Sequence, residues 1–276
     1  MPKSMKRILT TALLSLAATG CAVSPTGEKT LLLNSSAQMN SIGSQSFEEM
    51  KKQKPIEQDA KTNKYVACIA NAIVAQVPRE YGYQPSQWEL VVFKSDDKNA
   101  FALPGAKIGV YTGMIKLAKN HHQLASVIGH EVAHVLAQHS NARLSQQQLT
   151  QLGLATTSLI LGETVDSTTR QAALNAVGLG AQYGILLPYS RRHESEADQL
   201  GQELMAKAGF DPREAAALWQ EMSKQGGATP PEFLSTHPAP ATRIQQLSAQ
   251  ADTYLPVWRE AINNGRHPDC DRFKPY

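Results

Sequence analysis

The chain has 276 residues, enough for one large or two small domains, and its hydrophobic fraction of 42% is sufficient for a substantial core. With 27 basic and 24 acidic residues, the formal net charge is only +3, which gives no electrostatic basis for binding nucleic acid. The sequence shows no internal repeat of fixed period, so solenoids and propellers are excluded.

The first twenty residues differ in kind from the rest of the chain. Three basic residues lie among the first seven, and an apolar run over residues 8–18 follows them. This run is shorter than the roughly 20 residues that span a bilayer. A positive start, a short apolar stretch and small residues are together typical of a secretory signal, the alternative being an N-terminal core helix.

The signal segment ends in Gly20-Cys21, which resembles a bacterial lipoprotein signal, where the cysteine after the cleavage site receives lipid. The resemblance implies a signal peptide over residues 1–20, a lipidated Cys21 that anchors the chain to a membrane, and a tether over residues 21–35. Because Ala22 follows in place of aspartate, the same resemblance favours the periplasmic side of the outer membrane. A single domain is then expected over residues 36–276.

Apolar periodicity and turn residues predict the elements of this domain, which is expected to be of the α+β class. Three β-rich segments are predicted to form a small sheet: residues 88–93, 101–103 and 108–112. Helices are predicted to begin near Ser35 or Ser36 and after Pro212, and to cover residues 65–77 (ended by Pro78), 123–137, 194–208 and 242–251.

Residues 149–187 are rich in Ala, Gly, Leu and Thr. Their apolar runs are interrupted by polar residues such as Glu163 and Arg170, and none reaches the length of a membrane span. We expect helices packed on or near the active site, with a hairpin that dips into the membrane as the alternative.

Two cysteines remain after Cys21, at Cys68 and Cys270. An exported domain folds in an oxidising compartment, so this pair predicts a disulfide; two buried free thiols are the alternative.

Residues 130–134 read His-Glu-Val-Ala-His within an apolar predicted helix. Positions i and i+4 share one face of a helix, so His130 and His134 can bind one metal ion, while Glu131 can accept a proton from water. A solvated surface helix is the alternative, but an apolar helix that buries two imidazoles needs partners for them, and a metal supplies these. Zinc, with an open position for catalysis, requires a third protein ligand.

The best candidate for the third ligand lies in the segment from Arg191 to Asp198. Glu194 and Asp198 are four residues apart, so Glu194 can bind the metal while Asp198 orients a ligating imidazole. His193 is a competing ligand, and Glu196 is expected to be solvated.

Four blocks resemble the HtpX and CAAX-prenyl-protease type of zinc metallopeptidase, in its periplasmic lipoprotein branch of BepA-like and LoiP-like proteins. The blocks are residues 99–113 (NAFALPGAKIGVYTG), 128–139 (IGHEVAHVLAQH), 190–201 (SRRHESEADQLG) and, more weakly, 235–244 (STHPAPATRI). The resemblance implies a gluzincin-type fold, mostly helical, with a small sheet that borders the active-site cleft and pairs with extended substrate. One departure is Ala106, where relatives often have glycine, and it bears on the turn geometry.

The same resemblance assigns zinc ligation to His130, His134 and Glu194 and the base role to Glu131. It brings His237 near the zinc, either to stabilise the negative carbonyl oxygen or to cap the open metal position; a loop histidine held by Pro238 is the alternative. Arg243 is expected to pair with an acid and fix this loop. His139 also fits the family pattern, without an assigned role.

These features predict a zinc-dependent endopeptidase that degrades misfolded or stalled envelope proteins. The alternative is a chaperone or assembly factor for outer-membrane proteins, with a structural or latent zinc site and contacts to the assembly machinery. An intact Glu131 favours the enzyme, because a structural metal site needs no general base.

Overall fold

The computed structural model describes residues 21–161, 166–181, 187–224, 232–237 and 242–275, so the predicted signal peptide lies outside the described residues. The chain begins with a short antiparallel pair, β1 (Cys21–Val23) and β2 (Lys29–Leu31), in the segment expected to be a tether. Two helices follow, α2 (Ser36–Gln53) and α3 (Ala60–Val74). Both begin at capping side chains, since Ser35 accepts the Gln38 N–H and Asp59 accepts the Thr62 N–H.

Three strands form a small mixed sheet after two 3-10 turns, η1 (Arg79–Tyr81) and η2 (Pro85–Gln87). The strands are β3 (Glu89–Phe93), β4 (Ala100–Leu103) and β5 (Lys107–Tyr111), in the order β3-β5-β4. β5 runs parallel to β3 and antiparallel to β4, with Phe101 opposite Gly109. β4 therefore lies at an edge of the described sheet, and on this strand the Ala100 and Ala102 N–H groups are donated to Asn99 Oδ1 and Glu131 Oε2.

Helices make up the rest of the described chain, and the predicted organisation, mostly helical with a small sheet, is confirmed. In order they are α4 (Thr112–Leu117), α5 (His121–Leu136), α6 (His139–Leu161), α7 (Ser167–Ala181), α8 (Leu187–Lys207), α9 (Glu214–Lys224), α10 (Glu232–Thr236) and α11 (Arg243–Asn263), followed by the 3-10 turn η5 (Asp271–Phe273). Among the described residues, no helix is long and apolar enough to cross a membrane.

Helix α5 is the centre of the body, and all of its residues from Gln123 to Leu136 are buried. Helices α3, α8 and α9 and strand β4 pack around it. The crossing with α8 is unusually close: a Cβ atom on Gly129 would lie 2.8 Å from the carbonyl oxygen of Gly201. These two glycines let the backbones approach, which brings the residues after Gly129 opposite the N-terminal half of α8.

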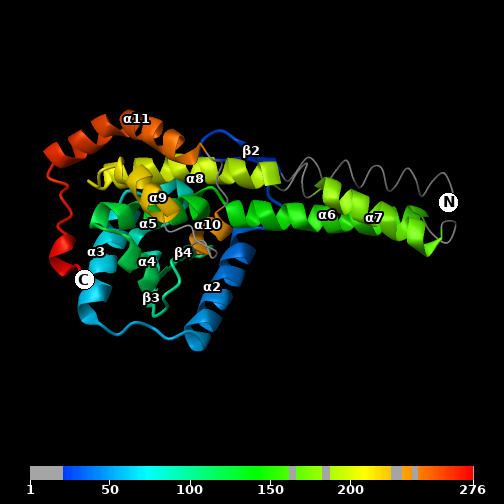
Figure 1. The fold of residues 1–276 in the computed structure, drawn as a ribbon, viewed down its shortest axis with the longest axis horizontal. Helices are drawn as coiled ribbons and strands as arrows, with labels where there is room; N and C mark the ends of the chain where they lie inside the picture. Colours follow the sequence, from blue (N-terminus) through cyan, green and yellow to red (C-terminus); the bar gives the residue numbers. More distant parts are fainter. Residues whose placement is uncertain (1–20, 162–165, 182–186, 225–231, 238–241, 276) are drawn as a thin grey trace.

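Helices α6 and α7 form a hairpin that projects from the body (Figure 1). Only the first turns of α6 lie near α5, so the expectation that residues 149–187 pack on or near the active site is wrong for most of this segment. Among the side chains that the structure describes, the large apolar ones exposed on the hairpin are Leu149, Leu152, Leu159, Val177 and Leu179. The apolar residues of α6 and α7 do not gather on one face of either helix. Neither helix therefore has an apolar face that would pack against the body.

Helix boundaries differ from the predictions where caps or tertiary contacts decide them. The helix expected over residues 65–77 starts earlier, at the cap Asp59, and ends at Val74. The last helix was expected to end at Ala251 but continues to Asn263 with Pro256 inside it. It arches over α8 (Figure 1), and a proline within a helix removes one hydrogen bond and favours such a bend.

A disulfide joins Cys68 on α3 to Cys270, just before η5. The bond fastens the C-terminal segment to the body, as the sequence predicted for this pair.

Candidate metal centre

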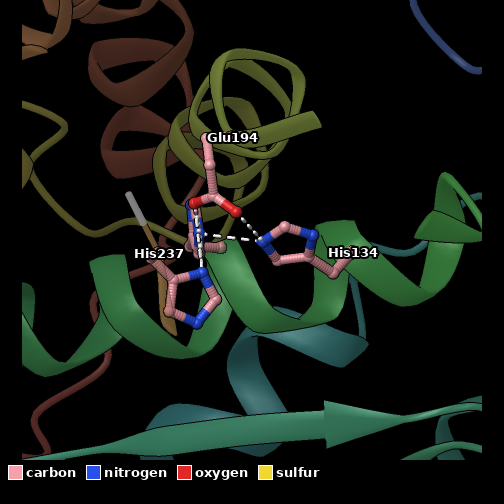
Figure 2. Close-up of side chains that lie close together, drawn as sticks. His134, Glu194 and His237 are labelled. Atoms are coloured by element: carbon pink, nitrogen blue, oxygen red, sulfur yellow. Dashed lines mark hydrogen bonds and ion pairs between the residues drawn. The ribbon is translucent and has the colours of Figure 1, made fainter. Parts of the chain in front are cut away.

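Three elements bring the candidate ligands together. Helix α5 presents His130 and His134 one turn apart, α8 presents Glu194 across the Gly129–Gly201 crossing, and His237 directly follows α10. Figure 2 shows the Glu194 carboxylate reaching from α8 toward the imidazoles of His134 and His237. All four side chains are buried.

The donor atoms of these residues converge on one point. The Nε2 atoms of His130 and His134 are 3.0 Å apart. The Glu194 carboxylate oxygens lie 3.2 Å from the first of these nitrogens and 3.5 Å from the second. His237 Nδ1 lies 3.2 Å from His130 Nε2 and 3.1 Å from Glu194 Oε2.

This arrangement fits a zinc ion. Zinc bonds to nitrogen and oxygen of about 2.0–2.1 Å place the ligands of a tetrahedral site roughly 3.3 Å apart, close to the spacing found here. Two imidazoles and one carboxylate form the donor set of a catalytic zinc site, and His237 supplies a fourth donor. Burial lowers the pKa of His134 well below its ordinary value.

Glu131 lies beside the donor group without belonging to it. Its Oε2 accepts the Ala102 N–H of strand β4 at 3.2 Å. Its Oε1 is buried, makes no hydrogen bond of good geometry, and lies 3.2 Å from His237 Nε2. Burial raises the pKa of the Glu131 carboxyl above its ordinary value. A carboxylate in this position can accept a proton from a group next to the metal.

Asp198 and Arg243 hold His130 from the side away from the donor group. Asp198 Oδ1 lies 3.0 Å from His130 Nδ1 and accepts a 2.6 Å hydrogen bond from the Arg243 guanidinium. The guanidinium stacks 3.8 Å from the ring centre of Trp219, and its other nitrogen lies 3.4 Å from Glu194 Oε2. Arg243 therefore pairs with two acids, one of which orients an imidazole.

His139 and Glu196 also border the centre. From the sequence, His139 received no role and Glu196 was predicted to be solvated. The solvated interpretation of Glu196 is wrong, because its side chain is 4% exposed and contacts His139. His139 in turn contacts His134, since Gln138 between α5 and α6 has a left-handed backbone (φ +53°) that turns the chain back. The sequence does show His139 five residues after the ligand His134. It does not predict the left-handed turn at Gln138 that brings the two rings together.

His193, the competing third ligand, lies outside the donor group of the described residues. Its ring stacks on His139, with the ring centres 4.0 Å apart. Pro238, the expected support of His237, lies outside the described residues.

A cavity of about 420 Å³ adjoins the centre. His134 forms part of its wall, together with Met39 and Asn40 of α2, Tyr83 after η1, and Pro104 at the end of β4. The cavity thus reaches the centre at His134, and Pro104 in its wall directly follows the edge strand β4.

Comparisons with known proteins agree with this site. The model of peptidase family M48 matches residues 60–251, which include every residue of the donor group. Mitochondrial metalloendopeptidase OMA1 of Schizosaccharomyces pombe is 35% identical over 190 residues, covering 67% of this chain and 52% of the relative. Human mitochondrial metalloendopeptidase OMA1 is 32% identical over 253 residues, covering 87% and 48%.

A bacterial relative is also similar. The beta-barrel assembly-enhancing protease of Yersinia pestis is 28% identical over 214 residues, covering 75% of this chain and 43% of the relative. The chain spans about half the length of the curated relatives it matches.

Proposed function

Because this chain belongs to peptidase family M48 and its donor group suits one zinc ion, we propose that it is a zinc-dependent endopeptidase acting on unfolded or misassembled proteins of the cell envelope. The observation that carries this proposal is the buried Glu131 beside the donor group, with one oxygen held by β4 and the other facing His237. A purely structural metal site has no use for such a carboxylate.

The proposed ligands are His130, His134 and Glu194, and zinc bound there would polarise the scissile carbonyl and lower the pKa of water. Glu131 accepts a proton from the attacking water and donates it to the leaving amine, so that the peptide bond is replaced by a carboxylate and an amine. The Ala102 N–H fixes the Glu131 carboxylate in place, which keeps its free oxygen directed at the reacting atoms.

Extended substrate is proposed to bind along β4. The strand lies at the sheet edge, and an added strand gains affinity from backbone hydrogen bonds without requiring a particular sequence. It would pair with carbonyl groups of β4, because the Ala100 and Ala102 N–H groups are donated to Asn99 and Glu131. The cavity beside His134 can receive one substrate side chain. This mode suits unfolded chains, because a folded protein rarely presents a free extended segment.

His237 is proposed to cap the metal in a resting form, since its Nδ1 lies at the distances of a fourth ligand. The alternative role, stabilising the negative carbonyl oxygen during hydrolysis, needs the same residue to stand beside the metal. Replacement separates the two roles: His237→Ala raises the cleavage rate if the residue caps the metal and lowers it if the residue assists hydrolysis.

The envelope location rests on the N-terminal sequence, where a positive start and an apolar run precede Cys21. We propose that Cys21 is lipidated and that the anchor holds the protein at the periplasmic side of the outer membrane. Palmitate label incorporated by wild type and absent from Cys21→Ser would support this, and label retained in the variant would refute it.

A chaperone or assembly role is the second candidate, favoured by the similarity to a protein named as a beta-barrel assembly-enhancing protease. In that case the contacts to the outer-membrane assembly machinery, and not hydrolysis, would carry the function.

The test uses Glu131→Gln and Glu194→Gln, with Glu203→Gln on α8 as a matched control outside the centre. Zinc content and the cleavage rate of an unfolded protein are measured for each. Glu131→Gln should lose hydrolysis by about 10²–10⁴-fold and keep zinc, because the amide cannot accept the proton. Glu194→Gln should lose zinc, because one anionic ligand is removed. Wild-type cleavage by Glu131→Gln, or cleavage that survives a chelator, would refute the enzymatic proposal.

A further inference from the structure

A continuous set of hydrogen bonds runs outward from His134, on the side away from the donor group. His134 Nδ1 lies 2.8 Å from His139 Nδ1, and His139 Nε2 lies 3.1 Å from Glu196 Oε2. The second oxygen of Glu196 accepts the Thr26 hydroxyl at 2.6 Å. The side chains of His134, His139 and Glu196 are nearly inaccessible, with exposed fractions of 5%, 1% and 4%.

When a metal is bound at Nε2 of His134, one arrangement of protons satisfies these contacts. The Nε2 of His134 faces the donor group, so its hydrogen is on Nδ1 and must be donated to Nδ1 of His139. His139 then carries its own hydrogen on Nε2 and donates it to Glu196, which accepts as a carboxylate. A neutral acceptor is less effective here than a charged one, because charge-assisted hydrogen bonds are roughly twice as strong. Glu196 therefore fixes the tautomer of His139, and His139 fixes the orientation of His134.

The other imidazole of the centre is held in a simpler way. His130 contacts a carboxylate directly through Asp198, and Asp198 is held by Arg243. In both cases an acid on α8 supports an imidazole on α5, but His134 is supported through an inserted imidazole. The insertion is possible because the left-handed Gln138 places His139 between the two helices.

The hydrogen bonds that run outward from His134 end in the N-terminal hairpin formed by β1 and β2. Thr26 is in the turn between these strands, and the following residues are attached to α6: the Leu33 N–H is donated to Ser145 Oγ at 2.8 Å, and Asn34 and Asn141 exchange hydrogen bonds. The N-terminal segment thus bridges α8 at Glu196 and α6 close to His139. It lies before residue 60, where the family match begins.

We propose that His139 and Glu196 are positioning residues for the metal ligand His134, and that Thr26 of the N-terminal hairpin completes this support and tunes the metal affinity of the centre. The inference rests on the metal site proposed above but does not depend on peptidase activity. It makes a segment outside the family match part of the metal centre.

The expected effects follow from what each substitution leaves behind. Glu196→Leu fills the space but accepts no hydrogen bond, so zinc affinity should fall about 10–100-fold, as for other residues that orient ligands. Glu196→Gln keeps an acceptor for His139, so its zinc affinity should fall less. Thr26→Val removes only the hydroxyl, so its zinc affinity should fall least. Thr26→Ser keeps the hydroxyl and should bind zinc with wild-type affinity.

The experiment measures zinc affinity of the full chain by competition with a chelator, and the visible absorption of the cobalt-substituted protein, whose bands report ligand geometry. Glu203→Gln on α8 and Thr156→Val on α6 are the matched controls. The proposal expects shifted cobalt bands and weakened zinc binding in Glu196→Leu and Thr26→Val, normal behaviour in both controls, and recovery in Thr26→Ser.

Two results would overturn the proposal and can be told apart. Zinc binding in wild type together with unchanged affinity and cobalt bands in Thr26→Val and Glu196→Leu refutes the positioning role alone. Absence of zinc binding in wild type refutes the metal site itself. If Glu196→Leu does not fold, Glu196→Gln and Thr26→Val decide the question, because they nearly preserve volume and alter single hydrogen bonds, and Thr26→Ser shows whether the hydroxyl alone restores affinity.

Discussion

Helices α5 and α6 are neighbours in the chain, separated by only two residues, but they differ in almost every physical respect. Helix α5 is surrounded on all sides and carries two donors of the metal centre. Helix α6 leaves the body after its first turns, and its side chains Leu152 and Leu159 are 55% and 82% exposed. The body therefore contains the buried core around α5 and the metal centre. The hairpin of α6 and α7 is attached to the body at one end.

This contrast implies that substitutions in the body are costly and that equivalent substitutions in the hairpin are not. The disulfide, the core around Leu124 and the close crossing at Gly129 belong to the body. Each of them provides a test of the contrast, and the hairpin offers a matched position for two of them.

The largest effect is expected from removing the disulfide with Cys68→Ser and Cys270→Ser. The bond closes a loop with a sequence separation of 202, and chain entropy predicts a loss of about 5 kcal/mol in the free energy of unfolding. Denaturant unfolding measures the loss, and wild type in reductant should match the double variant. Wild-type stability that is unaffected by reductant would show that the bond does not form.

The next effect concerns apolar side chains. Leu124 on α5 is fully buried, so Leu124→Ala should lower the free energy of unfolding by about 2–5 kcal/mol. Leu159→Ala on the hairpin should change it by less than about 0.5 kcal/mol, because the side chain already contacts water. Comparable losses in denaturant unfolding would mean that the hairpin is covered in solution, contrary to the structure.

The sequence predicts the body better than the hairpin because local patterns determine more of it. Periodic apolar residues identify α5, and i, i+4 spacing places His130 with His134 and Glu194 with Asp198. These regularities need no knowledge of the rest of the fold. They paired His130 with His134 and made Glu194 the best candidate for the third ligand, an assignment that the family resemblance also implied.

What the sequence did not predict depends on contacts between distant segments. The position of β5 between β3 and β4 is set by pairing partners, not by strand composition. Glu196 is buried because the N-terminal hairpin covers it, which helical periodicity alone cannot reveal. The direction of α6 and α7 was also missed, since an apolar composition without a dominant face is compatible with packing on the body or with projecting from it.

A smaller loss is expected from Gly129→Ala. The added Cβ would lie 2.8 Å from the Gly201 carbonyl oxygen, so α5 and α8 must separate. Overpacking of this kind costs about 1–3 kcal/mol, and zinc affinity should fall as well because His130 and Glu194 lie on opposite sides of the crossing. Denaturant unfolding and chelator competition measure the two losses. An alanine tolerated without either loss would show that the close crossing does not hold the donors in place.

The smallest expected effect is a gain in stability, and it comes from replacing glycine with alanine in the hairpin. Gly153 lies inside α6 and a Cβ built there meets no atom within 4 Å, as is also true of Gly178 in α7. Alanine favours a helix over glycine by about 0.5–1 kcal/mol, since glycine loses more conformational freedom on folding. Gly153→Ala should therefore slow amide hydrogen exchange along α6 by a few-fold while zinc affinity stays at the wild-type value. Gly178→Ala should do the same in α7. Faster exchange in either variant would mean that the hairpin face is occupied by another part of the protein, and the contrast with Gly129 would then fail.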